Sequence, residues 1–254
     1  TVVMKVGFLI TARLKSSRLP KKVIKEVLGK PLVVHMIDRI KQAAKIDEVI
    51  MCTSTNPQDD LLETIATSEA IACYRGSEDD VLVRLCEAAS QFRIDYIVNL
   101  TADCPLTDPV LIDYIVREYE QTRADFIELP GVPEGLIGVA VSALKKVVEL
   151  KAESETEAWG NYFKEPGMFK VHLPEVDAKY KHPTIKLSLD YPEDYEFITH
   201  VYEKLYDPNN AFSLLDILQL VRDHEELLSI NTHRWDSCTE HRKAAASVKW
   251  KAIL

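Results

Sequence analysis

The chain has 254 residues, of which 31 are lysine or arginine and 40 are aspartate or glutamate, so its formal net charge is −9. A hydrophobic content of 46% is typical of a globular protein, the acidic balance argues against nucleic-acid binding, and no apolar stretch approaches the ~18 residues that span a membrane. The five cysteines form no C-x-x-C pair, so zinc and thioredoxin chemistry are unsupported. The segment Lys5–Arg13 lacks the pattern of a signal peptide, and we therefore expect a cytoplasmic protein with reduced thiols.

Strand and helix patterns alternate through the first half of the chain. The apolar run Val6–Ile10 predicts a buried strand, and Pro31 suits the first position of a helix expected over 31–44. Asn56 and Asp108 are placed to cap two later helices. Such alternation predicts βαβ units, and therefore an α/β fold with a mostly parallel central sheet flanked by helices. The other strands are expected at 48–53, 71–74, 96–100 and 124–128, and the other helices at 57–68, 79–92 and 109–121.

The second half of the chain is less regular. Residues 135–142 look extended, and strands are expected at 169–173 and 185–189. No linker, repeat or low-complexity segment divides the chain. We therefore expect a single domain over residues 1–254, with an inserted arm at about 130–184. The helices of this half are predicted at 143–152, 155–163, 192–205, 214–223 and 234–249.

A basic loop follows the first predicted strand. Ligands of open α/β sheets lie outside the carboxyl ends of strands, and small residues let backbone N–H groups approach phosphate oxygens closely. The loop therefore favours a polyphosphate ligand, although a solvated surface loop is the alternative. Neither a Walker motif nor a G-x-G-x-x-G pattern is present. The twelve residues Thr11–Lys22 contain five cationic side chains, Arg13, Lys15, Arg18, Lys21 and Lys22.

Two aspartates follow apolar runs that are far apart in the sequence. Asp103 comes after the predicted strand 96–100, and Asp190 comes after the predicted strand 185–189. For each aspartate taken alone, a structural role in a turn or a helix cap explains the sequence as well as a metal-binding role does. Mg²⁺ prefers a few carboxylates together with phosphate oxygens, so the pair and the basic loop together favour phosphoryl-type transfer.

A third polar segment begins at Arg75. Gly76 and Ser77 precede the predicted helix 79–92, and Ser77 suits the N-cap position of that helix. The same two residues are small and polar enough to contact the edge of a nucleobase. The capping role already explains the acids that follow, so both interpretations stay open.

The segment Ala12–Lys22 resembles the A-R-x-x-S-x-R-L-P-x-K signature of CMP-Kdo synthetases and their SpsF-type cytidylyltransferase relatives. This resemblance implies a nucleotide-diphospho-sugar-transferase-like α/β sandwich. It also implies attack of an acceptor on the α-phosphorus of CTP with release of pyrophosphate, and a homodimer formed through the inserted arm. The resemblance continues in order along most of the chain, at Leu28–Leu32, Gly76–Leu82, Thr101–Leu106 and Leu189–Asp194.

The resemblance also implies residue roles. Asp103 and Asp190 would hold Mg²⁺, while Arg13 and Lys22 would hold the triphosphate, and these four form the expected catalytic set. Arg18 and Lys21 would assist them. Cytosine would be read near Leu9, Ala12, Arg75 and Ser77, in large part by main-chain groups. The full set of expected nucleotide contacts is Leu9, Ala12, Arg13, Arg18, Lys21, Lys22, Arg75, Ser77 and Thr101.

One region departs from the family pattern. SpsF-type proteins read G-L-D-V-E-V where this chain has Gly135–Ala140, which includes Gly138, and Glu155–Trp159 replaces a downstream Arg-Glu-His-like cluster. Charged side chains expected to face the acceptor are thus missing, which argues against an ordinary nonulosonic or octulosonic acid. Candidate acceptor contacts are Trp159, Asn161 and Lys186, with arm core as the alternative for Trp159 and a solvated side chain as the alternative for Lys186.

The sequence as a whole favours a Mg²⁺-dependent cytidylyltransferase that makes a CMP-activated metabolite for a surface polysaccharide. One alternative is a transferase of the same fold that uses another nucleotide or a glycosyl donor, although no D-x-D motif ends a predicted strand. A second alternative is a non-catalytic nucleotide-binding regulator. The joint presence of Arg13, Lys22, Asp103 and Asp190 argues against the regulator.

Overall fold

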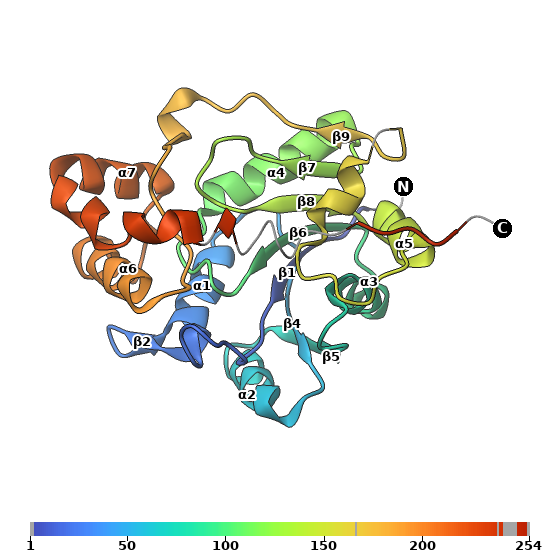
Figure 1. Cartoon of the computed structure of the whole chain (residues 1–254), viewed down its shortest axis with the longest axis horizontal. Helices are drawn as coiled ribbons and strands as arrows, with labels where there is room; N and C mark the ends of the chain where they lie inside the picture. Colours follow the sequence, from blue (N-terminus) through green and yellow to red (C-terminus); the bar gives the residue numbers. More distant parts are fainter. Residues whose placement is uncertain (1–2, 166, 238, 241–247, 253–254) are drawn as a thin grey trace.

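The computed structural model describes residues 3–165, 167–237, 239–240 and 248–252. Its centre is a seven-stranded sheet with the strand order β5-β4-β1-β6-β8-β7-β9 (Figure 1). The strands of this sheet are β1 (Val6–Thr11), β4 (Glu48–Ser54), β5 (Ala72–Gly76), β6 (Tyr96–Thr101), β7 (Phe126–Glu128), β8 (Ile137–Ala140) and β9 (Val171–His172).

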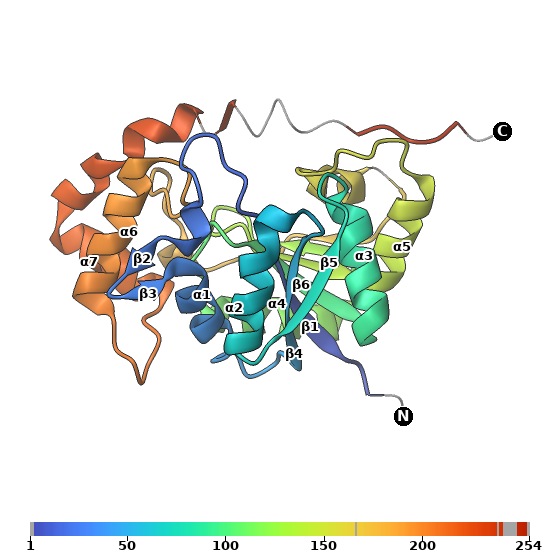
Figure 2. The ribbon, with the colours of Figure 1, turned by 90° about the horizontal axis from the view of Figure 1, so that it is seen from below.

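Helices cover both faces of the sheet. Figure 2 shows α1, α2 and α4 on one side of the strands and α3 and α5 on the other, with α6 and α7 beyond α1. A small antiparallel hairpin, β2 (Glu26–Val27) and β3 (Lys30–Pro31), lies next to α1. The helices are α1 (Leu32–Ile40), α2 (Asp60–Ser68), α3 (Val81–Phe92), α4 (Pro109–Thr122), α5 (Val141–Leu150), α6 (Pro192–Leu205) and α7 (Leu214–Asp223).

The sheet is mostly parallel, as the alternating pattern predicts. β1 pairs in parallel with both β4 and β6, and β4 pairs in parallel with β5. In this register Thr11 lies opposite Thr101, so the carboxyl ends of β1 and β6 lie side by side. The basic loop after β1 and Asp103 after β6 therefore start from the same edge of the sheet.

β8 interrupts the parallel order because it runs antiparallel to both β6 and β7. Its Gly138 lies against the core, where an added Cβ would come within 2.0 Å of the Tyr96 hydroxyl oxygen and 2.6 Å of an Ile115 methyl group. Only glycine fits so close an approach. The glycine at this departure from the family pattern is thus explained by packing.

Most predicted helices are confirmed, and two of their caps with them. The Asp108 carboxylate accepts a first-turn backbone N–H of α4 at 2.8 Å, and Asn56 caps a 3-10 helix over 57–59 that leads into α2. The predicted cap of α3 was wrong. Asp80 is the N-cap of α3, and the Ser77 hydroxyl instead accepts the backbone N–H of Asp80 at 3.1 Å.

The second half contains the larger corrections. The strand expected at 185–189 does not form, because this extended stretch pairs with no other strand. The helix expected at 155–163 is a 3-10 helix over 159–164. In the region of the helix predicted at 234–249, residues 235–237 and 239–240 are helical, 248–249 are not, and 238 and 241–247 lie outside the described residues.

The stretch 130–184, predicted as an inserted arm, contributes β8 and β9 to the central sheet and α5 to one of its faces. A role for this stretch in dimerisation stays a prediction. Within the described part of the chain, no helix combines the length and apolar character needed to cross a membrane.

Candidate functional site

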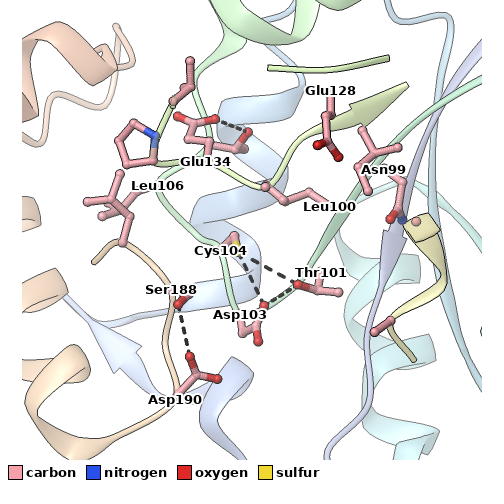
Figure 3. A pocket seen from close by; sticks show the side chains of 18 of the residues that line it. Asn99, Leu100, Thr101, Asp103, Cys104, Leu106, Glu128, Glu134, Ser188 and Asp190 are labelled. Carbon is pink, nitrogen blue, oxygen red and sulfur yellow. Dashed lines mark hydrogen bonds between the residues drawn. The ribbon is translucent and has the colours of Figure 1, made fainter. Parts of the chain in front are cut away.

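A cavity of about 950 Å³ opens beyond the carboxyl ends of the central strands. Residues from β6, the basic loop, the segment after β7 and the extended stretch before α6 line it. Figure 3 shows Asp103 and Asp190 next to each other in this cavity, although 87 positions separate them in the sequence. The cavity lies where open α/β sheets bind ligands.

The two predicted metal-binding aspartates meet at one lysine. The Lys22 ammonium nitrogen is 3.1 Å from Asp103 Oδ2 and 3.2 Å from Asp190 Oδ1. Burial lowers the pKa of Lys22, but the two carboxylates outweigh it and raise the pKa above its ordinary value. For Asp190, burial raises the pKa, and Lys22 and Lys186 together lower it well below its usual range. Both carboxylate and ammonium are therefore charged at neutral pH.

Backbone and side-chain hydrogen bonds fix this meeting point. The backbone N–H of Leu189 donates to the Asp103 carbonyl oxygen at 2.7 Å, which joins the two aspartate segments directly. The Thr101 hydroxyl donates to Asp103 Oδ1, and an Arg18 guanidinium nitrogen lies 3.2 Å from Asp190 Oδ1. Lys22, Arg18, Thr101 and both aspartates all line the cavity. The structure thus brings five of the predicted site residues together.

A divalent cation fits the pair of aspartates. Oδ2 of Asp103 and Oδ1 of Asp190 already face one positive charge, and carboxylate oxygens are the protein ligands that Mg²⁺ prefers. No cluster of three or more histidine, cysteine, aspartate or glutamate side chains that could hold a metal occurs in the described ranges. A cation at this pair would therefore draw further oxygen ligands from a bound nucleotide.

The other cations of the basic loop lie apart from the aspartates. The Arg13 guanidinium forms an ion pair of 2.9 Å with Glu157, which lines the cavity. Lys21 is exposed, has a φ of 52° and does not line the cavity. The loop is anchored by the buried Asp59, whose carboxylate accepts the backbone N–H of Leu14 at 2.8 Å. Asp59 lies 45 positions from Leu14 in the sequence and carries no motif, so it was not predicted.

The residues expected to read cytosine lie along the strand ends. Leu9 is fully buried in β1 and Ala12 follows that strand, while the Leu9 carbonyl oxygen accepts from Asn99 at 2.7 Å. The Arg75 side chain is held by the carbonyl oxygens of Ser54 and Asn56, at 2.9 Å each. These predicted base contacts do not line the cavity, and neither does Ser77. Their role in base recognition stays a prediction.

The predicted acceptor contacts Trp159 and Asn161 both line the cavity. Trp159 is only 5% exposed and packs edge-on against Phe163, so it belongs both to the core and to the cavity wall. Beside them Glu128 and Lys164 form an ion pair of 2.7 Å. Trp235, from the segment after α7, also lines the cavity and was not anticipated, since no motif marks it.

Lys186 was predicted as an acceptor contact or a solvated side chain, and the structure corrects both. Its side chain has no exposed surface and does not line the cavity. Its ammonium instead contacts Asp190 Oδ2 at 3.0 Å and Asp194 Oδ2 at 2.7 Å. The sequence did contain a signal for this arrangement, because Asp190 and Asp194 follow Lys186 by only four and eight positions.

Glu134 is a further cavity residue that no motif predicted. Its Oε2 accepts from the backbone N–H of Asp108 at 3.2 Å and from the Thr107 hydroxyl at 3.4 Å (Figure 3 labels Glu134). Its Oε1 is buried without a hydrogen-bond partner. Burial, and then the Asp108 carboxylate, raise the pKa of Glu134 to about 8, so this carboxyl is largely protonated at neutral pH.

Comparison with known proteins identifies the family of the chain. The family model described as cytidylyltransferase matches residues 8–213. The spore coat polysaccharide biosynthesis protein SpsF of Bacillus subtilis is 28% identical over 206 residues, which cover 78% of this chain and 86% of SpsF. A cytidylyltransferase structure from Leptospira borgpetersenii superposes with a TM-score of 0.81 at 26% identity, covering 89% of this chain and 97% of that one.

A second solved structure, the CMP:2-keto-3-deoxy-manno-octonic acid synthetase complexed with CTP, shares the fold. It superposes with a TM-score of 0.63 at 18% identity and covers 79% of this chain and 99% of its own. These matches confirm the resemblance carried by Ala12–Lys22 and the predicted fold class. The chain belongs to the cytidylyltransferase family and is a nucleotidyltransferase enzyme.

Proposed function

We propose that this enzyme transfers CMP from CTP to a small acceptor, with Mg²⁺ as its metal and pyrophosphate as the leaving group. The observation that carries the proposal is the convergence of Asp103, Asp190 and Lys22 at one point of the large cavity. The name of the matched family supports CTP as the nucleotide, as does the related fold that was solved with CTP.

The protein contributes positioning and charge. Lys22 and Arg18 are cations placed to neutralise phosphate oxygens, and Arg13 lies at the start of the same loop. Mg²⁺ held by Asp103 and Asp190 would supply charge neutralisation at the reacting phosphoryl group. In phosphoryl transfer most of the catalysis comes from such positioning and electrostatic stabilisation.

We place the acceptor in the half of the cavity that Trp159, Asn161, Glu128 and Glu134 line. This half combines aromatic surface with polar groups that can hydrogen-bond hydroxyls, which suits a sugar-derived metabolite. Ile137 stands where SpsF-type proteins carry an acid and also lines the cavity. SpsF is described as a polysaccharide biosynthesis protein, which supports an acceptor from a surface-polysaccharide pathway.

The proposal is tested by thermal unfolding of the protein with CTP, UTP, ATP and GTP, each with and without Mg²⁺. CTP with Mg²⁺ should raise the melting temperature, and the other nucleotides should raise it far less. Pyrophosphate release is then measured with CTP over a panel of sugar acids, neutral sugars and non-sugar alcohols. Equal stabilisation by all four nucleotides would contradict the assignment of CTP. If CTP binds but releases no pyrophosphate in the presence of any acceptor of the panel, the protein would instead be a non-catalytic nucleotide-binding regulator.

A further inference from the structure

A buried lysine lies directly behind Asp190. The Lys186 side chain is fully buried, and so is the side chain of Asp194. The Lys186 ammonium donates to the Ser188 carbonyl oxygen at 2.7 Å, to the Ser188 hydroxyl at 3.1 Å, to Asp190 Oδ2 at 3.0 Å and to Asp194 Oδ2 at 2.7 Å. A buried ammonium needs such a set of acceptors, because burying a charge without partners is costly.

The two oxygens of Asp190 have separate environments. Oδ2 accepts from Lys186, whose side chain is fully buried, and from the hydroxyl of Ser188 at 3.1 Å, a residue that lines the cavity. Oδ1 accepts from Lys22 and Arg18, both of which line the cavity. Lys186 thus contacts Oδ2 from the interior, while Oδ1 contacts two cations that line the cavity.

Lys186 is itself held from two sides. Asp194 Oδ2 accepts the backbone N–H groups of Asp190 at 2.9 Å and Tyr191 at 2.8 Å, so this carboxylate also closes the turn that carries Asp190. The Asn231 amide donates to Asp194 Oδ1 at 2.9 Å and to the Lys186 carbonyl oxygen at 3.0 Å. Asn231 lies beyond the range 8–213 that the family model matches, so this support comes from a segment outside the matched region.

We propose that Lys186 is a positioning residue for Asp190: its ammonium holds Oδ2 so that Oδ1 faces the place where the cation and the triphosphate bind. The inference rests on the proposed function, since it assigns Asp190 to the metal site. Loss of a residue that hydrogen-bonds to a metal ligand typically weakens metal binding about 10- to 100-fold.

The test must separate orientation from charge balance. Lys186→Met alone would leave two buried carboxylates without their cation, and the variant could fail to fold. We therefore combine Lys186→Met with Asp194→Asn, which removes one positive and one negative charge and keeps an oxygen acceptor at position 194 for the backbone N–H groups. The matched control is Lys30→Met with Asp38→Asn, which removes the 2.7 Å ion pair of Lys30 and Asp38 away from the cavity.

The measurement is Mn²⁺ binding by electron paramagnetic resonance in the presence of CTP, with thermal unfolding as the check on folding. The double variant at Lys186 and Asp194 should fold and should bind CTP in the absence of metal as wild type does. Its dissociation constant for Mn²⁺ should rise about tenfold. The control double variant should bind Mn²⁺ as wild type does. If the Lys186→Met version does not fold, Lys186→Gln with Asp194→Asn takes its place, with the same expected loss of affinity.

Two results are decisive, and they differ from each other. A folded double variant whose Mn²⁺ affinity stays within twofold of wild type overturns the positioning role of Lys186. The variant Asp190→Asn reports on the underlying assignment, because it should abolish most Mn²⁺ binding. Wild-type Mn²⁺ affinity in Asp190→Asn would contradict the proposed function itself, and the inference would fall with it.

Discussion

Three side chains, Lys22, Asp103 and Asp190, form the centre of the proposed site. The lysine ammonium contacts both carboxylates at 3.1–3.2 Å, and all three side chains are at most 23% exposed. A low-dielectric site strengthens such interactions, so a change in one charge there has a large effect on a reaction that moves negative charge.

Asp103→Asn should therefore reduce turnover by about 10²- to 10³-fold, the scale of single electrostatic deletions in other active sites. Because Asp103 is partly exposed and caps no helix, the melting temperature should change by only a few degrees. The measurement is pyrophosphate release under saturating CTP, with thermal unfolding in parallel. Asp223→Asn, at the end of α7, is the control and should match wild type in both. A parallel loss of activity and stability would make Asp103 a structural residue.

Glu134 gives a prediction about pH. Its pKa is about 8 in the folded protein against an ordinary value of 4.5. Between these two pH values Glu134 is protonated in the folded protein and ionised in the unfolded chain. The contribution of Glu134 to the free energy of unfolding is therefore complete below the unfolded pKa of 4.5. It is lost as the pH rises to the folded pKa, at up to about 1.4 kcal/mol per pH unit.

Glu134→Gln removes this titration. The free energy of unfolding of the variant, relative to wild type, should therefore rise from pH 5 to pH 8 and level off above that. Urea unfolding at several pH values measures this difference. A difference that is independent of pH would contradict the protonated state of Glu134.

At the scale of single elements, the N-terminus of α3 is tied to the segment after α5. The Asp80 carboxylate caps α3 and also accepts from the Lys151 ammonium and from the Thr156 hydroxyl. The Thr156 hydroxyl oxygen in turn accepts the backbone N–H of Leu82 at 3.0 Å. The G-S-E-D-D-V-L segment thus has a structural role through Asp80, in addition to any contact with a nucleobase.

Lys151→Met should cost about 3–5 kcal/mol of stability, because it leaves the buried Asp80 carboxylate without its cation. Lys249→Met is the matched control: it removes an ion pair with Glu153 in which the lysine side chain is 66% exposed, and it should have a much smaller effect on stability. Urea unfolding measures both. An equal decrease in the free energy of unfolding in the two variants would contradict the structural role of the buried pair of Lys151 and Asp80.

The elements that the sequence predicted correctly are those with strong local signals. The strands and helices up to α4 have regular apolar periodicity, and Asp108 with Pro109 marks a helix start by local chemistry alone. The failures depend on distant contacts. The stretch 185–189 is apolar enough for a strand but pairs with no other strand, because Lys186 turns to Asp194 and only the folded chain brings Asn231 to both.

The candidate site shows the same division. Asp103, Asp190 and Lys22 could be nominated because each follows a predicted strand or belongs to a motif, and the fold brings them together. Asp59, Glu134 and Trp235 carry no local pattern, so their places became apparent only from three-dimensional packing. The placement of Arg75 also depends on packing, since its guanidinium is committed to carbonyl oxygens at the end of β4.

At the scale of the whole molecule, the sheet explains why residues from three distant segments converge. Parallel pairing of β1 with β6 aligns the basic loop with Asp103, and the 2.7 Å hydrogen bond from Leu189 to Asp103 brings the segment before α6 to the same edge. The 950 Å³ cavity beside this point is large enough for both a nucleotide phosphate chain and an acceptor. Pairing of two copies through residues 130–184 stays a prediction, which the mass of the protein in solution would test.

In the proposed function, Asp103 and Asp190 bind one metal ion together with the phosphates of CTP. A crystal structure of the protein with CTP and Mg²⁺ tests it most directly. We expect one cation within about 2.1 Å of an oxygen from each aspartate, with the triphosphate against Arg18 and Lys22. A bound nucleotide whose metal contacts neither aspartate, or the two carboxylates turned to separate ions, would contradict it.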